Sequence, residues 1–305
     1  MTSPLRTQNP LAERRFAYAQ AAARDGDFAA AAEVFEQALE LDPAWATAWF
    51  ALAAARQRQG NFPAARAAFA RSVDLDPTDA QGASVRIAAL DGVAPKTLPA
   101  AYMARLFDDY APRFDAHLTE DLRYRGPLLL AQAIQAAAPG RRFASAIDLG
   151  CGSGLMAAPL RARVETLVGV DLSPGMIEEA RKTGLYDALE VGDVVDFLEG
   201  QTAADLIVAA DVFVYLGSLD AALECVPRIL RRGGVLAFTV EALRGSAGYQ
   251  LTRSGRYAHG EAYLADLAAR LGLHIAVADP VELRLERGVP VAGVLHVWRL
   301  PDGAA

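Results

Sequence analysis

Several residue types are scarce in this chain of 305 residues. Lysine occurs only at Lys96 and Lys182, so arginine supplies nearly all of the positive charge. The two cysteines, Cys151 and Cys225, are too few for a disulfide framework or for a metal cluster of their own. We therefore expect no metal site.

Long hydrophobic runs are also missing. No segment approaches the roughly 18 consecutive apolar residues that suggest a membrane span. The polar stretch from Met1 to Pro10 lacks the apolar core of a secretory signal peptide. A formal net charge of −7 argues against a nucleic-acid backbone or an anionic membrane as the main partner. These absences predict a cytoplasmic protein that binds neither nucleic acid nor membranes.

Hydrophobic residues, by contrast, are abundant. They make up 53% of the chain, against 22% charged residues, which indicates a globular protein with a sizeable core. A chain of this length forms one large domain or two ordinary ones.

A repeat with an offset of 34 residues occupies the N-terminal part of the chain. The matching pairs are Gly26-Asp27-Phe28 with Gly60-Asn61-Phe62, Ala31 with Ala65, Phe35 with Phe69, Leu39 with Val73, and Leu41-Asp42-Pro43 with Leu75-Asp76-Pro77. Each unit is expected to form two helices, because the glycine ends the first helix and the proline stops the second. Over about residues 11–78 the pattern resembles the tetratricopeptide repeat, with Trp49 and Leu52 near that family's early aromatic and leucine positions.

Only two units are convincing, whereas such arrays usually need about three for stability. Residues 79–90 are expected to add a capping helix. The repeat either recruits a protein partner or is a helical cap that binds nothing. Because prolines break the helical pattern between Gly92 and Pro99, the predicted domains are residues 1–92 and 101–305, joined by a linker at 93–100.

From Phe143 onward, short β-rich segments alternate with helical ones. This alternation predicts an α/β fold, a doubly wound parallel sheet with crossover helices. The expected strands are Ala144–Leu149, Thr166–Asp171, Leu189–Val191, Asp205–Ala210 and Val235–Val240, and the expected helices are Gly175–Thr183, Asp220–Arg231 and Glu261–Leu271. Two final stretches, His274–Leu285 and Val291–Leu300, predict a terminal hairpin.

A glycine-rich motif, Asp148-Leu149-Gly150-Cys151-Gly152-Ser153-Gly154, directly follows the first predicted strand. Glycines let the backbone turn sharply and let a ligand lie against the main chain. Their spacing differs from the dinucleotide fingerprint G-x-G-x-x-G, and the motif lacks the Lys-Ser/Thr ending of a P-loop. An oxidoreductase is therefore a weaker hypothesis.

Asp171 ends the second predicted strand, 21 residues after Gly150. In doubly wound folds an acid about 20 residues after the first glycine accepts hydrogen bonds from ribose hydroxyls. The alternative, a helix cap, is weaker because Ser173 before Pro174 suits that position better.

Two further carboxylates follow predicted strands. Asp193 lies after the third strand, where it would accept a hydrogen bond from an adenine amino group while a backbone N–H meets a ring nitrogen; the alternative is a solvated loop aspartate. Asp211 ends the most apolar strand, at the edge where ligands bind in such sheets, and its alternative role is a helix cap.

Together these motifs resemble the class I S-adenosylmethionine-dependent methyltransferases, over about Tyr102 to Leu300. The resemblance implies a Rossmann-like seven-stranded sheet with an antiparallel last strand, S-adenosylmethionine as cofactor, and methyl transfer to a small-molecule acceptor. The cofactor contacts it implies are Asp148, Gly150, Cys151, Gly152, Asp171, Leu172, Met176, Asp193, Val194 and Asp211. Among these, Asp148 would orient the ammonium group of the cofactor, directly or through water.

More narrowly, the chain resembles an uncharacterised bacterial family of methyltransferases with N-terminal tetratricopeptide repeats. The segment from Tyr110 to Leu118, with Tyr124 beyond it, is similar to their helix before the glycine motif. Since aromatic residues here fold over the cofactor in the wider family, Tyr110 and Phe114 are expected to cover the sulfonium. Core packing is the alternative role of Phe114.

The acceptor side gives weaker signals. Methyl transfer needs alignment of the reacting atoms, and a general base only if the acceptor must lose a proton. His259, Tyr257 and His117 are the candidate catalytic residues. The segments Gly245–Tyr249 and Ser254–His259 are expected to cover the acceptor.

Two arginines and the overall function each have alternative interpretations. Arg253 and Arg256 either bind an acidic substrate or are solvated loop charges. The alternative functions are methylation of a protein recruited by the repeat, and a non-catalytic scaffold that binds the cofactor. Nucleic-acid methylation is disfavoured, because Asp211-Val212-Phe213-Val214 lacks the Asp/Asn-Pro-Pro-aromatic tetrapeptide of amino-methylating nucleic-acid enzymes.

Overall fold

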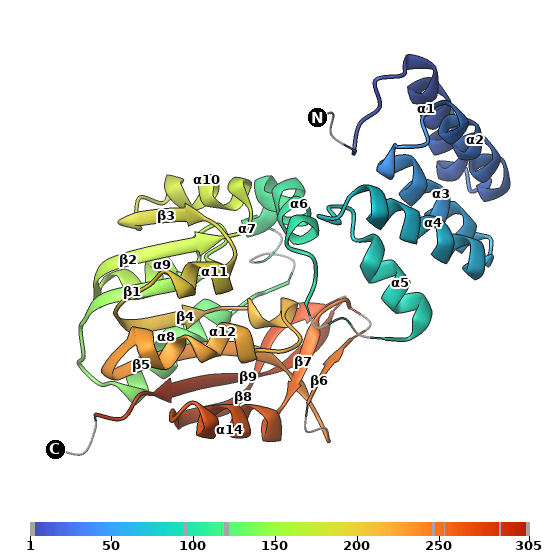
Figure 1. The fold of residues 1–305 in the computed structure, drawn as a ribbon. Helices are drawn as coiled ribbons and strands as arrows, with labels where there is room; N and C mark the ends of the chain where they lie inside the picture. The colour runs from blue at the N-terminus through green and yellow to red at the C-terminus, as the bar shows by residue number, and fades with distance from the viewer. Residues whose placement is uncertain are drawn as a thin grey trace. The chain divides into compact units, whose positions relative to one another are not determined.

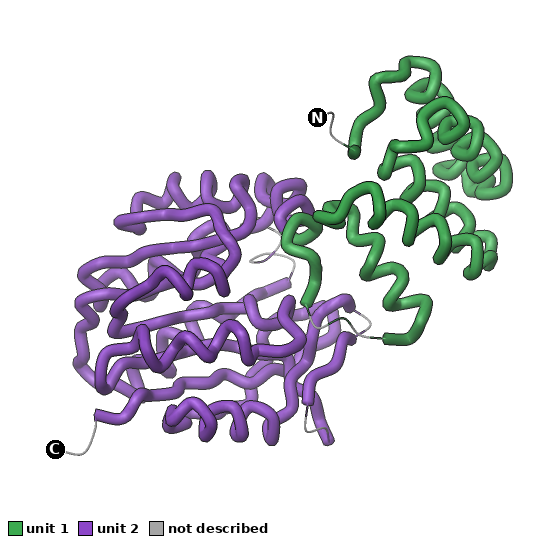
Figure 2. Tube along the Cα trace, in the orientation of Figure 1, with its two compact units in different colours: residues 1–103 green, residues 104–305 purple. Residues whose placement is uncertain are grey.

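The computed structural model describes residues 4–302 except residues 94, 96, 117, 119–121, 246, 247, 253 and 287. The chain forms two compact units, residues 1–103 and 104–305 (Figure 2). The division falls within helix α6 (Ala100–Tyr110). The domain bounds expected from the sequence stay a prediction. Within the described ranges every helix is too short or too polar to cross a bilayer.

The first unit is built from helices that pair in sequence order (blue to teal in Figure 1). They are α1 (Pro10–Arg24), α2 (Phe28–Leu41), α3 (Ala46–Arg58), α4 (Phe62–Leu75) and α5 (Ala83–Asp91). Gly26 and Gly60 have φ of +85° and +79°, a left-handed conformation that ends α1 and α3 without steric strain. The expected helix ends are therefore confirmed.

The sequence repeat is also a repeat of side-chain packing. Phe16 packs on Phe35 with ring centroids 5.2 Å apart. The equivalent residues of the second unit, Phe50 and Phe69, pack in the same way with centroids 5.3 Å apart. Ala83 of α5 belongs to the same hydrophobic cluster. Helix α5 thus adds the expected capping element to the two units.

The second unit contains a sheet whose core is parallel. β1 (Phe143–Leu149), β2 (Val164–Asp171), β3 (Ala188–Val191), β4 (Ala204–Ala209) and β5 (Leu230–Leu243) lie parallel in the order β3-β2-β1-β4-β5. β9 (Val289–Arg299) pairs antiparallel with β5, and β8 (His274–Glu286) pairs antiparallel with β9. The predicted parallel sheet, terminal hairpin and antiparallel last strand are confirmed.

Among the described residues, two short strands extend the sheet to nine strands, beyond the seven expected. β7 (Tyr257–Gly260) pairs parallel with the end of β5, and β6 (Tyr249–Leu251) pairs antiparallel with β7. Sequence analysis missed them because the segment is short and glycine-rich. Their position beside the carboxyl end of β5 brings residues 249–251 and 257–260 close to the edge where ligands bind in such folds.

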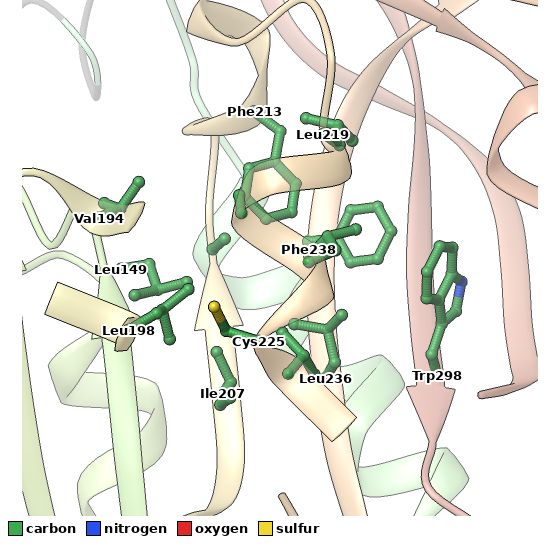
Figure 3. Packing of buried hydrophobic residues seen from close by; sticks show 14 of the residues in the cluster. Leu149, Val194, Leu198, Ile207, Phe213, Leu219, Cys225, Leu236, Phe238 and Trp298 are labelled. Atoms are coloured by element: carbon green, nitrogen blue, oxygen red, sulfur yellow. The ribbon is translucent and has the colours of Figure 1, made fainter. Parts of the chain in front are cut away.

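Helices cover both faces of this sheet, as a doubly wound fold requires. One face packs against α11 (Val194–Glu199), α12 (Asp220–Glu224), α13 (Val226–Ile229) and α14 (Glu261–Arg270), and the other packs against α8 (Gly126–Ala137) and α9 (Ala157–Arg161). Figure 3 shows the first of these layers, from Leu149 on β1 to Trp298 on β9. Trp298 is fully buried, with its ring 4.9 Å from that of Phe238.

The single helix expected over Asp220–Arg231 is wrong in two respects. The structure has two short helices, α12 and α13, and it assigns Leu230 and Arg231 to β5. Pro227 explains the break, because proline has no backbone N–H to continue the hydrogen bonding of α12.

Candidate functional site

The glycine motif forms a tight turn after β1. Gly150, Gly152 and Gly154 have φ of +56°, +53° and +95°. Side chains are disfavoured in this left-handed region by roughly 1–2 kcal/mol per residue. A Cβ on Gly150 would also lie 2.6 Å from Cγ2 of Val212, which follows β4. The main chain after β1 therefore lies directly against the residues after β4.

Asp171, at the end of β2, is tied to this turn. Its carboxylate accepts hydrogen bonds from the backbone N–H of Gly152 and of Ser173, both at 2.9 Å. Burial raises the pKa of the Asp171 carboxyl, and the two backbone donors oppose the rise. A carboxylate has about four acceptor positions, so both oxygens can accept further hydrogen bonds from a ligand.

Ser173 caps the helix that follows, α10 (Pro174–Lys182), by accepting from the N–H of Met176 at 3.0 Å. The expectation that Ser173 rather than Asp171 serves as the cap is confirmed. Asp108 of α6 accepts from the Ser173 hydroxyl at 2.5 Å and from the N–H of Gly175 at 2.9 Å. Sequence analysis missed Asp108, which gives no signal of its own because its partners lie more than 60 residues away.

Asp148 lies on β1 beneath the turn and is buried. It accepts a hydrogen bond from the Tyr186 hydroxyl at 2.6 Å. Burial raises the pKa of Asp148 to about 7, and the neighbouring charge of Asp171 adds to the rise, while the bond from Tyr186 opposes it. Tyr186 was also missed. It fits because Gly169 has no side chain: a Cβ there would lie 2.9 Å from the Tyr186 ring.

The other residues expected at the cofactor lie around these two acids. Cys151 is buried, and burial raises the pKa of its thiol. Met176 is buried at the start of α10, whereas Leu172 is half-buried. Asp193 caps α11 by accepting from the N–H of Val195 at 2.7 Å. Sequence analysis did not consider a cap at Asp193.

Aromatic side chains from the segment before α8 cover the turn. Phe114, in the short helix α7 (Phe114–Ala116), lies 3.6 Å from the position that a Cβ on Gly152 would take. The rings of Tyr110 and Phe114 pack edge to face with centroids 5.2 Å apart. The Ser153 hydroxyl donates to Asp115, which fastens this segment to the glycine turn. Neither aromatic residue is confined to the core, since both are half-buried.

Asp211, after β4, has φ of +60°, an uncommon conformation for a residue with a side chain. Its N–H donates to the Thr239 hydroxyl at 2.9 Å, and its carboxylate accepts from Arg284 of β8 at 2.8 Å. The second Nη of Arg284 donates to Glu241 of β5. Arg284 is 1% exposed in its side chain, so it lies buried between two carboxylates.

A β-bulge explains why Arg284 points inward. The β8–β9 register shifts between Glu282 and Arg284, and both Leu283 and Arg284 are buried although neighbours in a regular strand face opposite ways. Gly293 on β9 makes this possible, because a Cβ there would lie 2.4 Å from Leu283. Sequence analysis missed Arg284 for this reason: regular alternation assigns it to the other face.

Two of the three candidate catalytic residues lie in the described part of the chain. His259 and Tyr257 lie on β7 and are buried. His259 Nε2 is 2.9 Å from the carbonyl oxygen of Gly217, and burial lowers the pKa of His259 to about 4, so the ring is neutral at physiological pH. Burial raises the pKa of Tyr257 to about 12. Their catalytic roles stay a prediction.

Two other expected residues lie outside the described part of the chain, His117 and Arg253. Arg256 is described and is not a freely solvated loop charge. Its side chain is 23% exposed, with Nε 3.5 Å from the Tyr215 hydroxyl and Nη1 3.6 Å from Glu286. Tyr215, in the short helix η3 (Phe213–Tyr215), brings this arginine to the residues that follow β4.

Comparison with known proteins gives two family matches. A model described as a methyltransferase domain matches residues 147–238, and one described as a tetratricopeptide repeat matches residues 22–87. The first covers β1 to β5, including the glycine turn, and the second covers most of the helical unit.

Individual relatives are similar in sequence to part of the chain. Malonyl-(acyl-carrier protein) O-methyltransferase of Enterobacter lignolyticus is 33% identical over 140 residues, which cover 46% of this chain and 53% of that protein. Trans-aconitate 2-methyltransferase of Methylobacterium nodulans is 31% identical over 182 residues, covering 59% of this chain and 67% of the relative. The chain thus spans about half the length of the first relative and two thirds of the second.

A solved structure with a similar fold is the 1,6-didemethyltoxoflavin N1-methyltransferase of Burkholderia thailandensis, with bound 1,6-didemethyltoxoflavin and S-adenosylhomocysteine. It is 19% identical, covers 68% of this chain and 93% of that chain, and superposes with a TM-score of 0.52. A likeness at this identity concerns the fold.

Proposed function

Since the chain belongs to the class I S-adenosylmethionine-dependent methyltransferases and carries an N-terminal tetratricopeptide repeat, we propose that it binds S-adenosylmethionine at the carboxyl ends of β1 and β2 and transfers the methyl group to a small-molecule acceptor. One observation carries the proposal. The buried Asp171 carboxylate is fixed by the backbone of the glycine turn and by Ser173, at the strand ends where such folds bind nucleosides.

The residues at this edge fit the cofactor. Glycines at left-handed positions leave the turn without Cβ atoms, so a ligand can lie on bare main chain. A Cβ on Gly192 would have no neighbour closer than 3.8 Å, which leaves space beside Asp193 for a flat base. Asp171 would accept from the ribose hydroxyls, and Asp193, with a backbone N–H, would bind the adenine edge.

The remaining contacts concern the amino-acid part and the sulfonium. Asp148 would orient the ammonium group, and Gly150 and Gly152 would contact the methionine part. Tyr110 and Phe114 would face the sulfonium, since an aromatic face attracts a cation by about 0.5–2 kcal/mol. Cys151, Leu172, Met176, Val194 and Asp211 complete the proposed cofactor set.

When bound, S-adenosylmethionine supplies an already electrophilic methyl group, so the protein needs no group to activate it. What the chain contributes is alignment of acceptor and donor, which can supply roughly 7–11 kcal/mol of barrier reduction. The segment carrying Phe114 is fastened to the glycine turn through Asp115 and Ser153, and so would keep water from the reacting atoms.

A small acceptor is supported by the similar proteins. One is named for methyl transfer to trans-aconitate, and another for transfer to malonyl-(acyl-carrier protein), in which a small acyl group is attached to a protein. The helical repeat favours a second candidate function, methylation of a recruited protein. A hollow of about 400 Å³, lined by residues of α4 and α5 such as Val73 and Ile87 and by Val93 just after α5, supports that candidate.

Incubation of the full chain with methyl-labelled S-adenosylmethionine and separate metabolite and protein extracts tests the proposal. We expect the label in the metabolite pool. Label in the protein pool alone would favour the recruited protein. No label in either pool, together with cofactor binding by calorimetry, would identify a scaffold, and absence of binding would overturn the proposed function.

A further inference from the structure

Hydrogen-bond donors gather near Asp211, which pairs with Arg284 of β8. They come from Tyr124, Tyr215, Arg256 and Arg284, which we call the donor cluster. Two donors, the Tyr124 hydroxyl and Arg284 Nε, are buried and have no hydrogen-bond partner among the described residues. A buried polar group without a hydrogen-bond partner destabilises the folded protein, so such groups are usually satisfied by a ligand or by water.

Arg284 cannot turn away to satisfy its Nε. Both of its Nη groups are engaged, with Asp211 at 2.8 Å and with Glu241, and its side chain is 1% exposed. The two carboxylates more than offset its positive charge. Arg284 therefore offers a fixed N–H, and little net attraction, to whatever lies next to it.

The hydrogen bond and ion pair of Arg256 are longer than the 2.8 Å bond between Arg284 and Asp211. Its Nε lies 3.5 Å from the Tyr215 oxygen, and its Nη1 lies 3.6 Å from Glu286, whose side chain is 40% exposed. The Tyr215 hydroxyl oxygen accepts from Arg256, and its own proton can be donated to another group. Arg256 and Tyr215 thus form a donor pair, and the nearby charges of Asp211 and Glu241 act on the guanidinium together with that of Glu286.

The donor cluster lies next to the glycine turn. The Tyr215 ring packs edge to face on Phe107 at 5.3 Å, and Phe107 packs on Phe114, which lies over Gly152, at 6.2 Å. Burial raises the pKa of both Tyr124 and Tyr215, and the charge of Asp211 adds to each rise. Both hydroxyls are therefore protonated donors at physiological pH.

We propose that the donor cluster binds a carboxylate of the methyl acceptor, with Arg256 and Tyr215 as its main anchors and with Tyr124 and Arg284 Nε completing the set. This inference rests on the proposed function. A carboxylate has about four acceptor positions, so it can accept from several of these donors at once, and a guanidinium suits it because it can donate two parallel bonds.

A carboxylate acceptor also fixes the chemistry. It is ionised at neutral pH, with an ordinary pKa of about 4, so no base must remove a proton. One carboxylate oxygen bonds to the methyl carbon as the carbon–sulfur bond breaks, and the electron pair stays on sulfur. The products are a methyl ester and S-adenosylhomocysteine. On this route the neutral, buried His259 has no proton to accept.

The first test is calorimetric and uses the full chain. S-adenosylhomocysteine is titrated first, and its binding heat reports on the proposed function alone. Succinate is then added to the saturated protein, with succinamide as its uncharged counterpart. We expect succinate to bind and succinamide not to. Equal binding of the two probes would overturn the proposal while leaving the proposed function standing.

Variants assign the binding to named residues. Arg256→Gln should weaken succinate binding at least about tenfold, Arg256→Lys less, and Tyr215→Phe and Tyr124→Phe each by about three- to tenfold. Arg244→Gln, at an exposed arginine, is the matched control and should change nothing. S-adenosylhomocysteine affinity should stay within about twofold in Arg256→Gln. An unchanged succinate affinity in that variant would contradict the proposal.

The second test does not depend on the size of the acceptor. Metabolite products labelled with the methyl group are treated with mild alkali, which hydrolyses methyl esters and releases labelled methanol. We expect the label to become volatile. Label that resists alkali would show transfer to nitrogen, carbon, sulfur or a hydroxyl oxygen, and would refute the carboxylate acceptor even if succinate binds.

Discussion

The two ends of the proposed site are built in different ways. The cofactor end uses residues close in sequence: the glycine turn follows β1, and Asp171 ends the next strand. The donor cluster draws its members from four distant segments: the stretch before α8, η3, the residues before β7, and β8. A local motif can therefore reveal the first end, whereas only tertiary structure reveals the second.

The largest effect should come from the buried arginine that joins the two ends. Arg284→Met leaves Asp211 and Glu241 buried without their partner, and we expect the free energy of unfolding to fall by about 3–5 kcal/mol. Urea titration measures it. Arg244→Met is the control and should lie within about 0.5 kcal/mol of the parent protein. A loss below about 1 kcal/mol would mean that the carboxylates find other partners.

Gly150→Ala tests the contact between the glycine turn and the residues after β4. At φ of +56° alanine is strained by about 1–2 kcal/mol, and its Cβ would lie 2.6 Å from Val212, which adds about 1–3 kcal/mol. We expect a loss of about 3 kcal/mol by the same titration. In the double variant with Val212→Ala, only the part of the lost unfolding free energy that comes from the contact with Val212 should be recovered. Gly248→Ala, with nothing within 4 Å, is the control.

Much of the cofactor end could be predicted from sequence, because strand, glycine turn and acid follow one another locally. The repeat, the parallel strands and the cap at Ser173 were predictable for the same reason. Tyr186 was not predictable, since its place under the turn depends on Gly169.

The donor end could be predicted only in part, because the position of each member depends on a distant partner. A bulge, opposite a glycine at position 293, turns Arg284 inward. Arg256 was expected either to bind an acidic substrate or to be solvated, and only its approach to Tyr215 favours the first role. The pairing of β7 with β5 that brings it there has no sequence signal beyond a short apolar stretch.

Asp171→Ala isolates the cofactor end from the donor end. Hydrogen bonds to a charged group contribute about 1.5–3 kcal/mol, so affinity for S-adenosylmethionine should fall by about 10- to 150-fold. Succinate should still bind at high cofactor concentration. Asp196→Ala, at an exposed aspartate of α11, is the matched control. Unchanged cofactor affinity in calorimetry would remove Asp171 from the site.

The smallest effect is a pH dependence at the cofactor end. Burial raises the pKa of Asp148 to about 7, so its carboxyl becomes neutral as the pH falls through 7 and loses its attraction for the ammonium group. Affinity for S-adenosylmethionine should then fall, by no more than about tenfold per pH unit. Calorimetry from pH 8 to pH 6 measures how the affinity for S-adenosylmethionine changes with pH.

Asp148→Asn is the control for that slope. The amide cannot titrate, so affinity should be weaker at pH 8 and nearly constant down to pH 6. If the variant keeps the slope of the parent protein, another group is responsible.

A crystal structure of the full chain with S-adenosylhomocysteine tests the central claim most directly. We predict that the ribose hydroxyls donate to the Asp171 carboxylate and that the amino-acid part lies along the main chain of Gly150 to Gly152. A ligand bound elsewhere, or a glycine turn that Phe114 still fills at saturating ligand, would contradict the account.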